Sequence, residues 1–209
     1  MGIILTLYCA PPLPAAQSAA PTDTEAAYTK NIEKRVADIL ALPELKDAAR
    51  TAKVHDALIA QYRALRDWHD ANDKKLKGTT PDAAKEIASS LKTLHHEFLS
   101  KLSAELTHEQ VEKVKDKLTY GKVKVTYDAY CQSLPKLTET EKQKILEWLK
   151  EAREEALDGG SANEKSAIFK KYKGKINNYL DKQGYNVKQA QKDLAEKEKA
   201  KTGAKPNTE

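Results

Sequence analysis

Cysteine, glycine and proline are scarce in this sequence, and each shortage narrows the range of possible folds. The 209 residues include two cysteines, eight glycines and eight prolines. Two cysteines supply neither the paired spacing of a structural zinc site nor the framework of a disulfide-rich domain. Few glycines and prolines disfavour an all-β sandwich, whose many turns require both residues. The composition therefore favours an all-α protein.

Motifs of known enzyme chemistry are also missing. The sequence contains no glycine-rich phosphate loop, no GxSxG nucleophile elbow and no HExxH zinc motif. Carboxylate pairs are common because 32% of the residues are charged. None of these pairs lies in an apolar context that would raise a pKa for acid–base work. The sequence thus favours a non-catalytic protein, and we expect no cofactor.

The first 20 residues carry no charged side chain and have the pattern of a secretory signal peptide. An apolar run over residues 3–10 precedes a segment rich in proline and alanine, and cleavage after Ser18 satisfies the small-residue rule. A lipid anchor at Cys9 is less favoured, because Leu7 and Tyr8 precede it where small residues are needed. The run is far shorter than the ~20 apolar residues of a membrane span. We therefore expect a signal peptide over residues 1–20, a periplasmic or secreted protein, and no transmembrane segment.

Apolar residues recur at helical spacing through most of residues 23–196. This pattern predicts a single all-α domain, an irregular bundle of six or seven helices, followed by a disordered charged tail over residues 197–209. Three helix starts have the spacing of a capping box, in which a hydroxyl residue precedes Glu or Gln by three positions. They are Thr107 with Gln110, Thr138 with Glu141, and Ser161 with Glu164.

One segment departs from the helical pattern. Val123, Val125 and Tyr127 alternate with polar residues between Gly121 and Pro135. Alternation of this kind is typical of extended backbone, and no second strand-like segment is present to pair with it. We therefore predict an extended, non-helical crossover loop over about residues 120–136. It is either a packed connection or a functional loop.

Tyrosines in this segment and in the helix after Ser161 suggest a binding surface. We predict that the two segments pack together, because extended backbone needs hydrogen-bond partners. Tyrosine rings stack on sugar faces, and Lys and Asn bind hydroxyl and carboxylate groups, so the expected ligand is an acidic or neutral glycan or a partner protein. Export argues against a nucleic acid. The plain alternative is a set of tyrosines at the edge of the core. The candidate residues are Tyr120, Tyr127, Tyr130, Tyr172, Lys173, Asn177 and Tyr179.

Histidines provide a second candidate site. His69 and Asp73 are four residues apart, on one face of a predicted helix, and His95 and His96 lie in the next helix. If the two helices are antiparallel neighbours, these four residues could bind a metal ion. The simpler interpretation is a hydrogen-bonded histidine at the edge of the core and polar helix surface for the others.

Several long segments resemble a family of secreted bacterial helical proteins catalogued as domain of unknown function 3826. The segments that carry the resemblance are YRALRDWHDANDKKL, LTHEQVEKVKDKLTYGKVKVTYDAY, EAREEALDGGSANEKSAIFKKYKGKINNYL and GYNVKQAQKDL. The resemblance implies export, a helical fold and an occurrence near polysaccharide-degradation functions, and it supplies no catalytic residues. A weaker likeness links LTHEQ at residues 106–110 to the LTxxQ motif of Spy-type periplasmic chaperones.

Together these features favour an exported, non-catalytic binding or accessory protein linked to polysaccharide utilisation. A Spy-like periplasmic chaperone is one alternative, because LTxxQ is a chaperone motif as well as a helix cap. A metal-dependent enzyme that uses the region of His69 and His95 is another.

Overall fold

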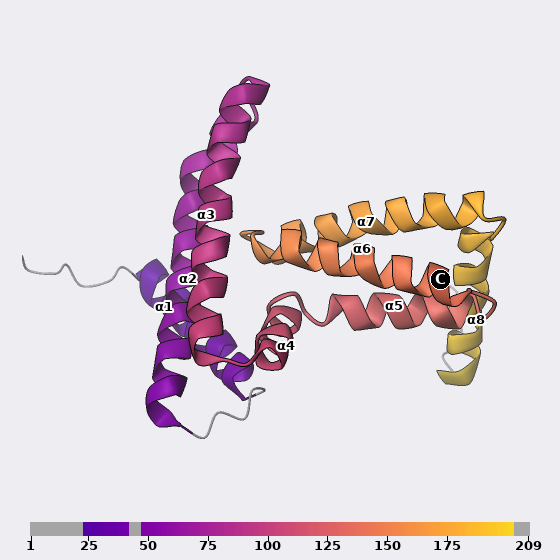
Figure 1. The fold of residues 1–209 in the computed structure, drawn as a ribbon, viewed down its shortest axis with the longest axis horizontal. Helices are drawn as coiled ribbons and strands as arrows, with labels where there is room; N and C mark the ends of the chain where they lie inside the picture. Colours follow the sequence, from indigo (N-terminus) through magenta and orange to yellow (C-terminus); the bar gives the residue numbers. More distant parts are fainter. Residues whose placement is uncertain (1–22, 42–46, 203–209) are drawn as a thin grey trace, which may run out of the picture.

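The computed structural model describes residues 23–41 and 47–202, and this part of the chain consists of eight α-helices joined by short turns (Figure 1). The fold is therefore all-α, as predicted. The helices are α1 (Asp23–Leu40), α2 (Ala48–Leu76), α3 (Pro81–Glu105), α4 (His108–Leu118), α5 (Lys122–Ser133), α6 (Glu139–Leu157), α7 (Ala162–Lys182) and α8 (Val187–Thr202).

The first four helices form one group around its own apolar core. α2 and α3 are long antiparallel neighbours, α1 packs along α2, and α4 closes the group against α1 and α3. Leu58, Leu102 and Val114 are fully buried where these helices meet. Leu157, the last residue of α6, also belongs to this core. The end of α6 therefore packs against the first group of helices.

The last four helices form a second group. α6 packs against α5 and α7, and α8 lies across the far end of α5 and α7. Ile145, Leu149, Ile176 and Leu180 are its fully buried centre. In Figure 1 the axes of α5, α6 and α7 run across the direction of the α2–α3 hairpin. The two groups thus meet near the α6–α7 turn and α4.

A buried arginine fastens α4 to α6. Arg153 donates hydrogen bonds to Glu112 at 2.5 Å and to Asp116 at 2.7 Å. Both carboxylates come from α4, one turn apart, so the guanidinium bridges them along one face of that helix. α4 is therefore held to both groups, to the first by its apolar stripe and to the second by this ion pair.

The prediction of an extended crossover loop over residues 120–136 is wrong, because most of that segment is α5. Val123, Tyr127, Tyr130 and Leu134 recur at intervals of four, three and four residues and pack in the second core, which is the period of a helix. Val125, which alternation would have turned inward, is 68% exposed. The segment contains so few residues that both periods fit its first half, and burial decided in favour of the helix. With this helix, the described part of the chain has eight helices, where six or seven were predicted.

Two of the predicted helix caps are complete in the structure. Thr107 with Gln110 and Thr138 with Glu141 form complete capping boxes at the starts of α4 and α6, which confirms both predictions. Asn186 precedes α8, and its side chain accepts a hydrogen bond from the Gln189 N–H at 3.1 Å.

Two predictions concern the ends of the chain. The expected signal peptide over residues 1–20 lies outside the described residues. α8 continues to Thr202, beyond the predicted start of a disordered tail at residue 197, and residues 203–209 are again outside the described part. None of the described helices combines the length and apolar character required to cross a membrane.

Candidate functional site

The turn between α6 and α7 joins the two groups of helices. α6 ends at Leu157, and Asp158 follows as its C-cap. The backbone carbonyl oxygen of Asp158 lies 2.8 Å from Nε2 of His69 on α2, and its carboxylate Oδ1 lies 2.8 Å from Nδ1 of His95 on α3. One residue of the turn is therefore bonded to both long helices of the other group.

The contacts of His69 determine which ring nitrogen carries a hydrogen. A carbonyl oxygen only accepts hydrogen bonds, so Nε2 carries the hydrogen and donates it to Asp158. Nδ1 then faces Asp73 Oδ1 at 2.9 Å and Glu164 Oε2 at 3.8 Å. Burial alone would lower the pKa of His69, but the hydrogen bonds to Asp158 and Asp73 outweigh it and raise the pKa above its ordinary value.

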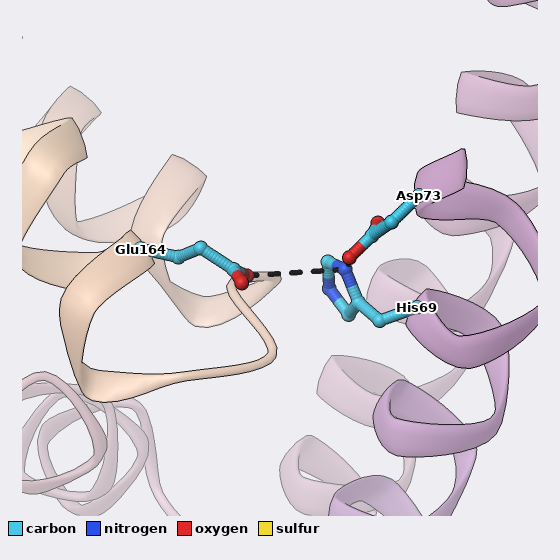
Figure 2. A group of neighbouring side chains, drawn as sticks. All are labelled: His69, Asp73 and Glu164. Atoms are coloured by element: carbon cyan, nitrogen blue, oxygen red, sulfur yellow. Dashed lines mark hydrogen bonds and ion pairs between the residues drawn. The ribbon is translucent and has the colours of Figure 1, made fainter. Parts of the chain in front are cut away.

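These three side chains form a compact group of possible metal ligands. Figure 2 shows the His69 ring between Asp73, one turn further along α2, and Glu164, which extends toward it from the first turn of α7. One ligand atom of each side chain lies within 4.8 Å of the other two. The His69 side chain is 16% exposed, whereas those of Asp73 and Glu164 are 45% and 46% exposed. The group therefore has a part-buried ring on one side and is open to water on its carboxylate side.

The Glu164 side chain does not complete the capping box that was predicted at the start of α7. Ser161 caps α7 as expected, since its hydroxyl accepts a hydrogen bond from the Glu164 N–H at 3.2 Å. The Glu164 carboxylate, however, accepts a hydrogen bond from the N–H of Gly160 at 2.8 Å, one residue before the cap. The box is thus only half formed, and the carboxylate lies near His69.

His95 and His96 do not join this group. His95 Nδ1 is bonded to Asp158, and this hydrogen bond raises the pKa of His95 above its ordinary value, with burial opposing the shift. His96 is exposed and meets the His95 ring edge-on, with 5.7 Å between the ring centroids. Of the four predicted metal ligands, the structure therefore groups His69 with Asp73 and leaves the other two apart.

Gly160 allows the turn to approach His69 closely. A Cβ atom at Gly160 would lie 2.6 Å from Cδ2 and 2.8 Å from Cγ of the His69 ring, well inside the optimal carbon–carbon separation of about 3.5–4.0 Å. The contacts of its two nitrogens with Asp73 and the Asp158 carbonyl hold the ring in place. Glycine is thus required by space at this position and not by backbone conformation.

Gly160→Ala is therefore expected to lower the free energy of unfolding by about 1–3 kcal/mol, as overpacking does elsewhere. Gly174→Ala is a matched control, because Gly174 lies within α7 and its Cβ would meet nothing within 4 Å. Alanine in that helix should stabilise the protein by roughly 0.5–1 kcal/mol. Thermal unfolding of both variants measures the difference, and a Gly160→Ala variant as stable as the parent would contradict a close contact between the turn and His69.

The same turn also borders a cleft between the two groups of helices. Its inner part is a cavity of about 100 Å³, and an open hollow of about 480 Å³ adjoins it. Pockets for small ligands typically measure about 300–1,000 Å³, so the combined space is large enough for one. We call it the tyrosine cleft, after the aromatic rings among its principal lining residues, which are Tyr28, Arg35, Tyr62, Arg66, Tyr120 and Lys165.

Lys165 forms the buried wall of this cleft. The residue is 7% exposed, and its Nζ donates a hydrogen bond to the Leu118 carbonyl at 3.3 Å. Within the described chain, it forms no ion pair with a carboxylate. Burial lowers the pKa of Lys165 to about 8; the charges of Asp158 and Glu164 oppose this shift and that of Arg35 adds to it. A buried cation without a paired anion is unfavourable, and an anionic ligand in the cleft would relieve that cost.

The floor of the cleft is held in place by contacts between α1 and α2. The Tyr28 hydroxyl donates a hydrogen bond to the Tyr62 carbonyl at 2.9 Å, and the Arg66 guanidinium lies 4.3 Å from the centroid of the Tyr28 ring. Burial raises the pKa of the Tyr62 hydroxyl to about 12, with the charge of Arg35 opposing the shift. Tyr62 thus stays protonated and neutral at physiological pH, and the rings are fixed before any ligand arrives.

Tyr120 lines both parts of the cleft and has an unusual backbone. It is the one non-glycine residue with positive φ, 61°, in the described ranges, and it is followed by Gly121 at 62°. Its ring is large and the residue is 50% exposed, so burial does not explain its position. The positive φ belongs to the C-terminal cap of α4, where the Gly121 N–H donates a hydrogen bond to the Asp116 carbonyl at 2.7 Å and the Tyr120 N–H donates one to the Lys117 carbonyl at 3.0 Å. The exposed ring at both parts of the cleft makes Tyr120 a candidate ligand contact.

The predicted tyrosine surface is divided in the structure. The segment of residues 120–136 does contact α7, because the hydroxyl of Tyr130 donates a hydrogen bond to Asn177 Oδ1 at 2.6 Å and lies 3.3 Å from the Lys173 carbonyl. Tyr130 is however buried, and Tyr120 lines the cleft instead. The predicted residues therefore do not form one shared surface, because Tyr120 precedes α5 and lines the cleft, whereas Tyr127 and Tyr130 lie on the face of α5 that packs in the second core.

The other predicted surface residues serve the packing of the second group. Tyr127 is half-buried against the second core. Tyr172 and Tyr179 lie on the α6 side of α7, where Tyr179 meets Trp148 edge-on with 5.3 Å between ring centroids. These three tyrosines are the core-edge residues of the plainer interpretation.

Sequence reasoning missed Lys165 and Glu164. Lys165 precedes Phe169 by four residues on the buried stripe that continues to Ile176 and Leu180, and a lysine in register with that stripe was an available signal. The sequence predicts Glu164 only as part of a helix cap, and nothing local to it indicates that the carboxylate faces α2.

The described part of the chain is thus an all-α protein in two groups of helices, with a histidine–carboxylate cluster and a cationic cleft at their junction. The chain belongs to the family described as protein of unknown function (DUF3826), whose model matches residues 29–200. This confirms the family resemblance of the sequence. No curated protein matches the chain. The family match carries no relationship to Spy-type chaperones, and the LTxxQ segment is accounted for by the capping box of Thr107.

Proposed function

We propose that the protein is an exported, non-catalytic binding protein that serves polysaccharide utilisation, and that it binds an acidic glycan in the tyrosine cleft. The observation that carries the proposal is Lys165, a buried cation without a carboxylate partner at the wall of a cleft lined by tyrosines. A carboxylate group of a sugar acid would pair with this cation, and the sugar ring would lie against an aromatic face.

Charge supports an acidic over a neutral glycan. Arg35 lines both parts of the cleft, and Lys117 and Asp38 line the outer hollow. Arg66 is neutralised in part by its 2.6 Å ion pair with Glu25. The remaining balance at the cleft is positive, which attracts a polyanion and makes its binding sensitive to salt.

Export is supported by the apolar leader and its small-residue cleavage pattern at Ser18. A role beside polysaccharide-degrading enzymes is what the family resemblance implies. N-terminal sequencing of the protein isolated from its native host tests the first point, since an intact Met1 would contradict cleavage.

Calorimetric titration with trigalacturonic acid, and with a neutral galactose trisaccharide as control, tests the binding. We expect the acidic trisaccharide alone to bind, and we expect added salt to weaken the complex. Tyr120→Gly should weaken binding by roughly tenfold, about 1.4 kcal/mol, because it removes a ring from the cleft. The same change should not destabilise the chain, since glycine suits the positive φ of residue 120.

Tyr172→Ala provides the matched control, because Tyr172 lies on the α6 side of α7 and does not line the cleft. We expect its affinity to equal that of the parent protein. Equal binding of the acidic and neutral trisaccharides, or an unchanged affinity in Tyr120→Gly, would contradict the proposed role of the cleft.

A further inference from the structure

We propose that His69, Asp73 and Glu164 form a binding site for a divalent transition-metal ion, with Zn²⁺ the preferred cation, that links α2 to α7. The site goes beyond glycan binding and does not depend on it. It differs from the metal site expected from the sequence, because Glu164 replaces His95 and His96 as the partner of the His69–Asp73 pair.

The geometry around Nδ1 of His69 carries the inference. Because Nε2 donates its hydrogen to Asp158, a neutral ring presents the lone pair of Nδ1 to the carboxylates of Asp73 and Glu164. Three electron-rich groups then converge without a cation between them. A proton on Nδ1 points in one direction and satisfies Asp73 at 2.9 Å, but Glu164 at 3.8 Å lies beyond hydrogen-bond distance. A metal ion bonded to all three groups satisfies them together.

His55 shows how an ordinary histidine ion pair looks in the same protein. Its Nε2 lies 2.8 Å from Glu33, and its Nδ1 lies 3.1 Å from Asp56. The two carboxylates approach opposite nitrogens, so a protonated imidazole donates one hydrogen bond to each. At His69 both carboxylates approach the same nitrogen, and the imidazolium does not offer them equivalent hydrogen bonds.

Neighbouring groups orient two of the three ligands. The hydrogen bond from His69 Nε2 to the Asp158 carbonyl fixes the ring, and the Gly160 N–H holds the Glu164 carboxylate at 2.8 Å. Metal-bound histidines typically donate their second N–H to a carbonyl or carboxylate in this way. The ligand set is therefore oriented before an ion binds.

The donor atoms select the cation. One imidazole nitrogen with two carboxylate oxygens suits Zn²⁺, whereas Mg²⁺ and Ca²⁺ prefer oxygen alone. Three protein ligands leave a fourth position of tetrahedral zinc open to water. A hollow of about 380 Å³ lined by His69, Asp158 and Glu164 lies beside the group and gives solvent access to that position.

Titration of the chelator-treated full chain with ZnCl₂, by calorimetry and by thermal unfolding, tests the proposal. We expect one Zn²⁺ per chain, a rise in Tm on binding, and no comparable effect of Mg²⁺. Asp73→Asn and Glu164→Gln keep the shape of each side chain but remove its charge, so each should weaken zinc binding by roughly tenfold or more. Unchanged Tm values of the metal-free variants show that they fold.

His55→Gln is the matched control, and it should leave zinc affinity unchanged. The proposal is overturned if millimolar zinc neither binds in a one-to-one ratio nor raises Tm. It is equally overturned if both carboxylate variants bind zinc as tightly as the parent, or if His55→Gln alone removes binding. Because glycan titrations are performed without metal, failure of this site and failure of the tyrosine cleft are distinguishable.

Discussion

Lys165→Met should give a protein that is more stable at neutral pH and no longer binds an acidic glycan. The pKa of Lys165 is about 8 in the folded chain, against an ordinary value of 10.5, and this difference corresponds to about 3 kcal/mol of lost stability at pH 7. Methionine fills a similar volume without a charge. After the loss of the hydrogen bond to Leu118, we expect a net gain of about 1–3 kcal/mol.

The pH dependence of this gain separates the charge from other causes. The folded pKa of Lys165 lies below the unfolded one, so below pH 8 the ammonium is charged in both states and its burial cost is fully present. As the pH rises from about 8 to 10.5, the folded chain is neutral at this residue while the unfolded chain still binds a proton. The parent protein therefore gains relative stability over this range, and the advantage of Lys165→Met should shrink toward pH 10.5.

Denaturant unfolding of parent and variant at pH 7 and pH 10 measures this difference. Lys170→Met, at an exposed position of the same helix, is the matched control and should change stability little at either pH. A Lys165→Met protein that is less stable at pH 7, or equally stabilised at both values, would contradict a buried charge as the cause.

Lys165→Met is expected both to stabilise the protein and to abolish glycan binding, and this combination is typical of a residue kept for function. A buried, unpaired lysine lowers stability, and most stabilising substitutions at functional positions lower activity. Phe169, one turn further along the same stripe, is buried in the second core, so an apolar residue at position 165 would continue the pattern. The proposed anionic ligand would account for a lysine at this position.

The sequence predicted those features of the fold that depend on neighbouring residues. Thr107 and Thr138 cap helices because their hydroxyls and the residue three positions later satisfy free N–H groups locally. Local patterns gave the wrong structure for the segment from Val123 to Tyr130, because both a strand period and a helix period fit it. Only its packing against α6 and α8 selected the helix.

The candidate sites, like the fold, could be predicted only where their residues are close in the sequence. His69 and Asp73 were paired from sequence, since residues four apart on a helix share a face. Glu164 joins them from α7, and its approach depends on the place where the α6–α7 turn lies against α2, which Gly160 allows. The tyrosine cleft draws its walls from α1, α2, α7 and the end of α4, so no local pattern could have revealed it.

Tyr130→Ala should be among the most damaging single substitutions in the second group of helices. The residue is 1% exposed and packs in the core formed by α5, α6, α7 and α8. Removing a buried aromatic ring typically lowers the free energy of unfolding by about 3–5 kcal/mol, because a cavity replaces it. Tyr130→Phe keeps the ring and loses only the contacts of the hydroxyl with Asn177 and the Lys173 carbonyl, so a loss of about 1–2 kcal/mol is expected.

The same pair of variants decides whether this tyrosine belongs to a structural or a binding surface. Tyr130 does not line the tyrosine cleft, so Tyr130→Phe should bind trigalacturonic acid with the affinity of the parent while its Tm falls. Burial, moreover, raises the pKa of Tyr130, which keeps its hydroxyl protonated and donating to Asn177. Denaturant unfolding and calorimetry on one preparation provide both values. An unchanged Tm with weakened binding in Tyr130→Phe would place Tyr130 in the binding surface predicted from the sequence. It would contradict a structural role of Tyr130 between α5 and α7.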